Sequence, residues 1–523
     1  MGFDINEMVK SKEALRRKLA DRPIAEKLRL AEDLSERALA LRPDTTPSPP
    51  DTPWPIPSHW KWKKMSDVAT VIGGGTPATD HKEYFGGEIP WITPADLSKY
   101  TDKTISRGAR NITQAGLDNS GARLLPTGTV LFSSRAPIGY VAVAANPVAT
   151  NQGFKSFILN DEVRPDFVYY YLQRARDLAR SLASGTTFLE ISRKKAAQIP
   201  IPVPPRDEQE RVVAEIEKQF TRLDAGVASL KRVQTALKRY RASVLKAACE
   251  GRLVPTEAEL ARKENRSYET GEQLLQRILK ERREKWNGKG KYKEPMQPSV
   301  VDMPNLPVGW FWAGTEQLTA GIDNAMTIGP FGSNLMVKDY REAGVPLIFV
   351  REIRSENFQR SDTRRISKEK ADELATHKVR GGDLVITKMG EPPGDTAIYP
   401  EGFPDAVATS DCIKLTPNRT GMSATFLKYV IRAQPVKSQI ERITRGVAQK
   451  KVSLARFKTV AIPLPPYAEQ QRIIAEIERR LTVVDEMQTT LDVEFRRTLR
   501  LRQSVLQRAF EGRLANTEFN GAI

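Results

Sequence analysis

Two stretches of the chain carry an apolar residue at every seventh position. The first series is Ile216, Leu223, Leu230, Leu237 and Val244, and the second is Ile477, Val484, Leu491 and Val505, with Thr498 at the remaining position. A seven-residue apolar period is typical of helices that pack side by side in a coiled coil. The pattern therefore predicts two long helices, each with one apolar seam.

The two seams belong to a repeated block. Residues 201–253 align with residues 462–514 without a gap, and 24 of the 53 pairs are identical. Each copy opens with a Pro-Pro pair, which cannot lie inside a helix, followed by acids that suit a helix N-terminus. Gly251 and Gly512 then suit a C-cap. The span from Arg206 to Glu250 predicts a helix of roughly 68 Å at about 1.5 Å per residue.

Equal lengths and the gapless repeat favour packing of the two helices on each other. We expect an antiparallel pair with an approximate two-fold axis, because a parallel pair would bring the segments that precede both helices to the same end, where they would collide. The alternative is that each helix packs only on its own domain.

The segments that precede the two helices in the sequence also resemble each other. "PSHWKW" at 57–62 matches "PVGWFW" at 307–312, and "GGEIPWI" at 86–92 matches "EAGVPLI" at 342–348. Both segments combine short β-rich runs with Gly/Pro turns and one helix before the final strand. The predicted fold class is α+β, with two α/β modules that share a framework and alternate with the two helices.

These patterns divide the chain as follows. We predict an N-terminal helical segment (1–42), a Pro-rich linker (43–56), a first module (57–205), a first helical region (206–255), a helix that ends at Gly288 with a linker (256–304), a second module (305–466), a second helical region (467–515) and a tail (516–523).

The distribution of charged residues along the chain indicates which class of partner it binds. The chain has 82 Lys and Arg against 64 Asp and Glu, a net charge of +18. Residues 56–205 hold 18 basic and 12 acidic residues, residues 305–463 hold 23 and 17, and residues 206–255 hold 11 and 7. Basic side chains that neutralise phosphates supply much of the affinity of proteins for nucleic acids. A polyanion is the expected partner, and a well-solvated surface is the alternative.

Several features argue against other classes of protein. No apolar run approaches the roughly 20 residues that cross a bilayer, and the N-terminus is amphipathic, so we expect a cytoplasmic protein. Two cysteines and three histidines, all far apart, do not predict a disulfide or a metal site. "LPPY" at 464–467 is similar to a methyltransferase motif but lacks its Asn or Asp, and its twin at 203–206 lacks the Tyr as well. The Gly-rich run at 73–75 lacks the Gly-Lys-Ser/Thr of a phosphate loop. We therefore expect no catalytic residue in this chain.

Several phrases resemble one known family. "GGGTP", "EIPWITPADL", "GTTFLEIS", "IGPFGSNL" and both "IPxPPxxEQ" blocks, together with the order of the predicted elements, resemble the specificity subunit of type I restriction-modification enzymes. The resemblance implies two target recognition domains that each read one half of a split DNA target, while the helices set the unread spacer. It also implies two modification subunits that use S-adenosylmethionine to methylate adenine, and translocase-nuclease subunits that use ATP and Mg²⁺, with no cofactor on this chain. A single-chain DNA methyltransferase or nuclease and a coiled-coil DNA-binding scaffold remain the alternatives.

Candidate DNA contacts are basic, hydroxyl or amide side chains in turn-rich segments, because such groups bind phosphates and base edges. In the first module they are Thr76, Lys82, Tyr84, Arg107, Arg110, Arg135, Thr186 and Thr187. In the second module they are Ser333, Lys338, Tyr340, Arg364, Arg365, Lys388, Arg445, Gln449 and Lys450.

Overall fold

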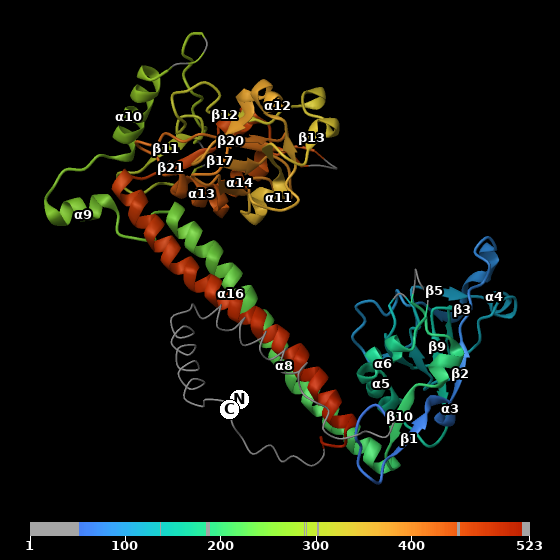
Figure 1. The fold of residues 1–523 in the computed structure, drawn as a ribbon. Coiled ribbons are helices and arrows are strands. Elements are labelled where there is room, and N and C mark those ends of the chain that lie inside the picture. Colours follow the sequence, from blue (N-terminus) through green and yellow to red (C-terminus); the bar gives the residue numbers. More distant parts are fainter. Residues whose placement is uncertain are drawn as a thin grey trace, which may run out of the picture. The chain divides into compact units, whose positions relative to one another are not determined.

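The computed structural model describes residues 52–135, 137–184, 189–286, 288, 290–300, 303–446 and 450–514. The predicted N-terminal helical segment, most of the Pro-rich linker and the tail lie outside these ranges. The chain forms two compact units, one of Met1–Asp224 with Thr498–Ile523 and one of Ala225–Arg497. Each unit therefore contains one module and a part of both long helices (Figure 1).

The first module is built on two sheets. The larger has the order β2-β9-β6-β7-β4, made of Ala69–Gly73, Lys155–Leu159, Val130–Phe132, Val141–Ala144 and Thr104–Ile105. The smaller has the order β5-β3-β8, made of Arg110–Ile112, Phe85–Ile92 and Ala149–Thr150. The helices are α3 (Met65–Val68), η1 (Lys82–Tyr84), α4 (Gln114–Asp118), α5 (Pro165–Arg174), α6 (Arg176–Ser181) and α7 (Arg193–Ala197). In the core, Phe167 and Tyr171 of α5 share one apolar cluster with Phe132 and Phe157 of the larger sheet.

The second module repeats this plan with different connections. One sheet has the order β12-β20-β17-β18, made of Met326–Ile328, Cys412–Leu415, Leu384–Thr387 and Thr396–Ile398. The other has the order β13-β15-β14-β19-β16, made of Tyr340–Arg341, Arg365–Ile366, Val345–Ile348, Ala406–Ala408 and Lys378–Val379. Its helices are η2 (Gly332–Asn334), η3 (Val337–Asp339), α11 (Val350–Ser355), α12 (Lys368–Glu373), η4 (Ala375–His377), α13 (Ala424–Arg432), α14 (Gln434–Ile443) and α15 (Leu454–Lys458). The parallel pair β14–β19 corresponds to β3–β8 of the first module.

A two-stranded antiparallel ribbon closes each module. In the first module β1 (Lys61–Lys64) pairs with β10 (Pro200–Val203), and in the second β11 (Phe311–Gly314) pairs with β21 (Ala461–Leu464). The last strand of each ribbon leads through the Pro-Pro pair directly into a long helix, α8 (Arg206–Cys249) or α16 (Tyr467–Phe510). Each helix therefore starts at a fixed point of its module.

A buried glutamine fastens each of these helix starts. The side chain of Gln209 donates to the carbonyl oxygens of Glu162 (2.8 Å) and Pro204 (3.1 Å) and accepts from the backbone N–H of Arg164 (2.9 Å). Gln470 occupies the matching position in the second module. It donates to the carbonyl oxygens of Gly421 and Pro465, both at 3.2 Å, and accepts from the N–H of Ser423 at 3.0 Å. Both glutamines are fully buried, so the first turn of each helix is tied to the loop before α5 or α13.

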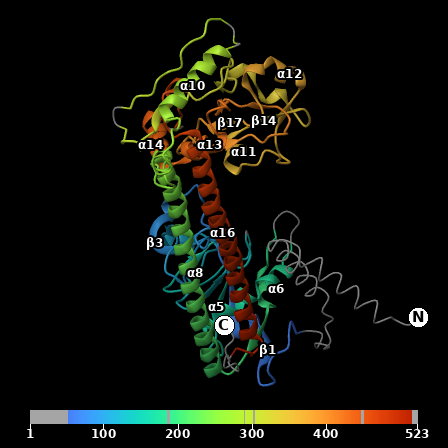
Figure 2. The same cartoon turned by 90° about the vertical axis from the view of Figure 1, so that its left-hand side faces the viewer.

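The long helices pack against each other within both units, and they run antiparallel (Figures 1 and 2). In the first unit Arg502 of α16 forms an ion pair with Asp224 of α8, and in the second unit Arg241 of α8 forms one with Asp485 of α16. The two pairs lie 17 residues apart on either helix, from 224 to 241 and from 485 to 502, as one antiparallel register requires. The predicted fold class is confirmed, and the alternative in which each helix packs only on its own domain is wrong.

All nine predicted seam residues lie in apolar clusters of the two units. Ile216, Leu223 and Val505 belong to the cluster under the first module. Leu230, Leu237, Val484 and Leu491 form a separate cluster between the helices, completed by Phe495. Val244 and Ile477 join the core of the second module. The seam therefore merges at both ends with the core of a module.

The segment between α8 and the second module contains α9 (Glu257–Glu264) and α10 (Gly271–Glu284). The prediction that this second helix extends to Gly288 is wrong, because Lys285 already leaves the helical conformation. The Trp286 ring turns back onto Tyr292 at 5.7 Å, and this contact favours an early end of the helix.

Replacing Gln209 with Ala should destabilise the first unit by roughly 1–3 kcal/mol, because two carbonyl groups and one N–H lose their partner in a buried place. Urea unfolding followed by circular dichroism measures this change. Gln503→Ala is the matched control, because Gln503 is exposed on α16 in the same unit. Equal unfolding midpoints for the two variants would contradict the role of the buried amide.

Candidate nucleic-acid interface

One polar network joins four segments of the first module. The Thr76 hydroxyl contacts the side chain of Gln152, and the backbone carbonyl of Gln152 accepts from Lys155 Nζ at 3.4 Å. Lys155 Nζ also lies 3.2 Å from Glu190 Oε1, and Arg135 Nη1 lies 3.7 Å from Glu190 Oε2. The structure thus brings together two predicted residues, Thr76 and Arg135, through three residues that were not predicted.

Arg110 lies beside this network. Its guanidinium group lies 5.4 Å from the centre of the Trp91 ring and 5.8 Å from that of Phe85. Trp91 Nε1 donates to the carbonyl oxygen of Gly75 at 3.0 Å, next to Thr76. Stacking on aromatic rings holds the exposed Arg110 side chain on the β5-β3-β8 sheet, and its donors have no hydrogen-bond acceptor among the described residues.

Lys82 and Tyr84 lie together in η1, which leads into β3. The Tyr84 ring stacks on His81, with ring centres 4.9 Å apart. Hydrogen bonding to Glu83, with the charge of that carboxylate, raises the pKa of His81. Lys82 is exposed.

A single carboxylate fixes the loop that carries Arg107. Asp96 Oδ2 accepts from the backbone N–H of Thr93 at 2.7 Å, and Asp96 Oδ1 accepts from the N–H of Ala109 at 2.8 Å. Ala109 precedes Arg110. The Asp96 carboxylate therefore sets the path of the short segment between the two exposed arginines.

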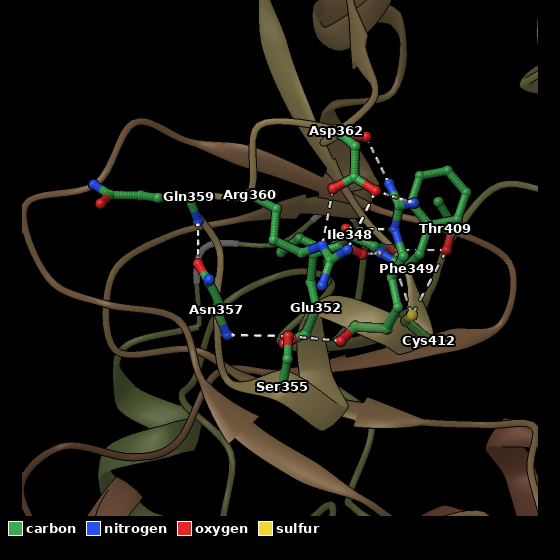
Figure 3. A network of polar contacts seen from close by, with 11 residues as sticks. Ile348, Phe349, Glu352, Ser355, Asn357, Gln359, Arg360, Asp362, Thr409 and Cys412 are labelled. Carbon is green, nitrogen blue, oxygen red and sulfur yellow. Dashed lines mark hydrogen bonds and ion pairs between the residues drawn. The ribbon is translucent and has the colours of Figure 1, made fainter. Parts of the chain in front are cut away.

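Glu352 has the corresponding place in the second module (Figure 3). Its Oε2 accepts from the N–H of Phe349 at 3.0 Å, and its Oε1 accepts from Arg351 Nε at 2.8 Å. Arg351 in turn donates to the side chain of Asp362 at 3.0 Å and to its carbonyl oxygen at 2.8 Å. Glu352 is 1% exposed, so this buried acid anchors, through Arg351, the loop that leads to the predicted Arg364 and Arg365.

The second loop is also held by its own charges. Hydrogen bonding from Arg360, with the charges of Arg351 and Arg360, holds the pKa of Asp362 below its usual range. Arg364 is exposed, and Arg365 on β15 donates to the carbonyl oxygen of Gly344 at 3.1 Å. Lys338 in η3 is exposed, and Tyr340 on the neighbouring strand β13 packs edge-on against Phe349 at 6.3 Å. These four predicted residues share the β13-β15-β14-β19-β16 side of the module.

Lys388 centres a second group of predicted residues. Its Nζ donates to the carbonyl oxygen of Ser410 at 3.0 Å and lies 4.4 Å from the centre of the Phe331 ring. Burial lowers the pKa of Lys388. Ser333 lies in η2, which directly follows Phe331.

The two remaining described candidates flank Lys388. Arg445 exchanges two backbone hydrogen bonds with Lys451, at 3.0 and 2.9 Å, and Lys451 also bridges to Met389. Lys450 Nζ lies 3.6 Å from Glu391 Oε1. The predicted Thr186, Thr187 and Gln449 lie outside the described residues.

Sequence reasoning missed Lys155, Glu190, Lys451, Asp96 and Glu352. One signal was available, because Glu190 and Lys451 each lie 11 residues before a copy of the repeated block and carry opposite charges. The two acids that anchor the loops carry no such signal, since an acid after a strand is common in any turn-rich segment.

Other kinds of site are not apparent in the part of the chain that the structure describes. There, no three His, Cys, Asp or Glu residues form a group that could hold a metal ion. Cys249 and Cys412 are free and buried, and burial raises the pKa of both thiols. Within the same residues, no helix is long and apolar enough to span a bilayer.

The described residues thus form two basic α/β modules, each continued by one helix of an antiparallel pair. A family model described as the type I restriction modification DNA specificity domain matches residues 57–238 and 341–492. These ranges hold 182 and 152 of the 523 residues. The chain belongs to this family.

Individual relatives agree with this assignment. The chain is 44% identical over 159 residues to the specificity subunit of the type I restriction enzyme MjaIX from Methanocaldococcus jannaschii, a match over 30% of this chain and 37% of that subunit. It is 21% identical over 485 residues to the EcoKI specificity subunit from Escherichia coli K12, a match over 88% of this chain and 90% of that subunit.

A solved structure shares the fold. It comes from work on complex assembly and conformational transition of the type I R-M system, and it superposes with a TM-score of 0.56 at 17% identity. The match covers 88% of this chain and 100% of the solved chain.

Asp96→Ala should free the Ala109 amide and loosen the segment from Arg107 to Arg110. A hydrogen bond to a charged acceptor contributes about 1.5–3 kcal/mol, so the protection of this amide against hydrogen exchange should fall roughly 10- to 100-fold. Hydrogen-deuterium exchange with mass spectrometry measures the effect. Asp118→Ala is the control, because exposed Asp118 accepts only from Gln114 within α4 among the described contacts. Unchanged exchange of residues 106–110 in Asp96→Ala would refute the anchoring role.

Proposed function

We propose that this chain is the sequence-specificity subunit of a type I restriction-modification complex and that it performs no catalysis itself. Each module reads one half of a split DNA target, and the helix pair fixes the unread spacer between the halves. The observation that carries the proposal is the duplication of one construction: a basic module, a closing ribbon and a clamped helix start, present once in each unit.

The chemistry of the exposed side chains supports DNA as the ligand. Arg110, Arg107 and Arg364 offer guanidinium groups on anchored loops, and guanidinium is the group that most often contacts guanine edges and phosphates. Lys82, Lys338 and Lys450 offer point charges suited to the phosphate backbone. A loop that is already held in place loses less conformational entropy when it binds a ligand.

The length of the helices sets the distance between the half-sites. At 44 residues each, α8 and α16 are about 66 Å long. This length corresponds to about 20 base pairs at about 3.4 Å, an upper limit for the spacer. Because the seam continues into the core of both modules, a change in helix length would be transmitted to the modules.

The remaining surface of the helix pair is available for partner subunits. We expect two modification subunits, which would bring S-adenosylmethionine, and restriction-translocation subunits, which would bring ATP and Mg²⁺, all in the cytoplasm. Exposed apolar side chains on the helices, among them Val233, Met487 and Leu499, suit such contacts.

Genome-wide mapping of N6-methyladenine in a host that expresses this chain with its modification subunit tests the proposal. A bipartite methylated sequence should appear, and the purified chain alone should transfer no methyl group. Arg110→Ala should weaken one half of the sequence, and Arg364→Ala, as its counterpart in the other module, should weaken the other half. Methyl transfer by the chain alone would favour a single-chain enzyme. DNA binding without any associated modification subunit would favour a scaffold.

Shortening both helices by one heptad should shorten the spacer without changing the half-sites. Residues 229–235 of α8 face residues 491–497 of α16 in the observed register, so deletion of both blocks preserves the pairing. The loss is about 10 Å, or at most about three base pairs. Methylation mapping reads out the spacer, and deletion of residues 229–235 alone serves as the control that breaks the register. Altered half-sites with an unchanged spacer would contradict the proposal that the helix pair sets the spacer length.

A further inference from the structure

The end of β6 in the first module and the end of β17 in the second are the same place in the fold. The N–H of Ser134 donates to the carbonyl of Gly153 at 2.7 Å, and its carbonyl accepts from Ile191 at 3.0 Å. Lys388 makes the matching bonds, to Asp411 at 2.8 Å and from Val452 at 3.1 Å. Ser134 and Lys388 therefore occupy equivalent backbone positions.

Both modules bring one lysine ammonium group to this place, but from different strands. In the first module Lys155 on β9 places its Nζ 3.2 Å from Ser134 Oγ and 3.4 Å from the carbonyl oxygen of Gln152. In the second module Lys388 follows β17, and its Nζ lies 3.0 Å from the carbonyl oxygen of Ser410, the residue that matches Gln152. Lys155 is 9% and Lys388 7% exposed, so both ammonium groups are held in place by largely buried stems.

The neighbouring charge is reversed between the modules. Glu190 lies 3.2 Å from the Lys155 ammonium and neutralises it. In the first module, backbone bridges pair Glu190 with Arg135 and Ser184. The matching bridges of the second module pair Lys451 with Met389 and Arg445. The second module thus has a lysine where the first has the neutralising acid.

The Lys388 ammonium has no carboxylate within ion-pair distance among the described residues. Its described contacts are a carbonyl oxygen and the face of the exposed Phe331 ring, while the charges of Asp411 and Lys451 act on it in opposite directions without forming an ion pair. Residues 447–449, which lie between Gly446 and Lys450 in the sequence, are Val, Ala and Gln and carry no acid. A backbone bridge between Met389 and Lys451 brings Lys451 next to this position, and a largely desolvated ammonium group with a second cation nearby favours an oxyanion over solvent.

Building on the proposed function, we infer that Lys388 and Lys451 form a phosphate site that the first module lacks, and that this site holds one backbone phosphate of the DNA half-site read by the second module. The lysine ammonium group binds phosphate as a point charge, without the planar fork of donors that arginine offers. The short reach of a buried stem keeps Nζ at the sheet end rather than deep in a groove. The site therefore adds affinity and orientation rather than base choice.

Salt dependence of DNA binding tests this inference. The full chain, with its modification subunits, is titrated with a duplex that carries the mapped methylation target at several salt concentrations. Loss of one phosphate contact should lower the slope of log K against log salt by about 0.9. Lys388→Met should show this drop with an unchanged methylated sequence, and Lys388→Arg should restore most of the slope.

Lys451→Glu is the second variant, because it places the acid of the first module beside Lys388 without touching a buried position. It should lower the slope by at least as much as Lys388→Met. Lys155→Met is the matched control, and because Glu190 already neutralises Lys155, it should leave the slope unchanged. Thermal unfolding of each variant shows whether the second module is intact.

Three results from DNA binding and methylation mapping would overturn the inference. They are a wild-type slope in Lys451→Glu, an equal drop in Lys155→Met, and a relaxed methylated sequence in Lys388→Met, which would make Lys388 a base reader. Titration with inorganic phosphate in the absence of DNA tests whether the site binds a free anion instead. The inference would also be overturned if phosphate binding were saturable and were lost in both Lys388→Met and Lys451→Glu while the DNA slopes stayed unchanged. Absence of sequence-specific binding by the wild-type complex would instead refute the proposed function.

Discussion

The buried side-chain amides of Gln209 and Gln470 are the contacts on which the rest of the architecture depends. Each amide satisfies two carbonyl groups and one N–H at the point where a module ends and a 44-residue helix begins. A long helix amplifies any change of angle at its base, so a module can be held in a defined direction only if this first turn is rigid. Prolines remove helical alternatives on one side of the turn, and the glutamine fixes the other side. The closing ribbon before this junction and the long helix after it are therefore joined by a fixed turn.

The two copies of the junction differ in what covers them. In the second unit Glu469, next to Gln470, accepts from Trp310 Nε1 at 2.9 Å and from the N–H of Glu257 at 2.8 Å. Burial raises the pKa of Glu469, and the arginine partners of Glu257 compensate the charge there. In the first unit the matching Glu208 pairs with the exposed His59, and Trp60 Nε1 has no partner among the described residues. The segment after α8 thus completes a polar core in the second unit.

The sequence predicts the helices well because their physics is local and periodic. Seven-residue spacing, Pro-Pro starts and Gly ends specify α8 and α16 to within a residue or two. It predicts a helix before the final strand of each module but does not single out α5, because "PDFVYYYLQR" contains Val and four aromatic residues that favour strands. Residues Phe167 to Leu172 are all buried, between the sheet and the long helices, and this packing stabilises α5. The same holds for Gln209, which reads as an ordinary helix-start residue until the loop before α5 folds over it.

The candidate site is predictable only in part for a related reason. Exposed arginines such as Arg107 and Arg364 can be chosen from turn-rich sequence, but the contacts that hold their loops cannot. Asp96 binds the N–H of Ala109, 13 residues further on, and Glu352 reaches the loop at Asp362 only through Arg351. Lys155 and Lys388 show the limit most clearly. One ammonium position is reached from two different strands, so no alignment column contains both lysines, whereas the backbone bonds around Ser134 and Lys388 make the equivalence plain. Duplication has preserved the backbone frame and the place of a charge, while the residue that supplies the charge and the residue that neutralises it have changed. A module that keeps its frame in this way can alter its contacts with DNA without altering the helix that positions it.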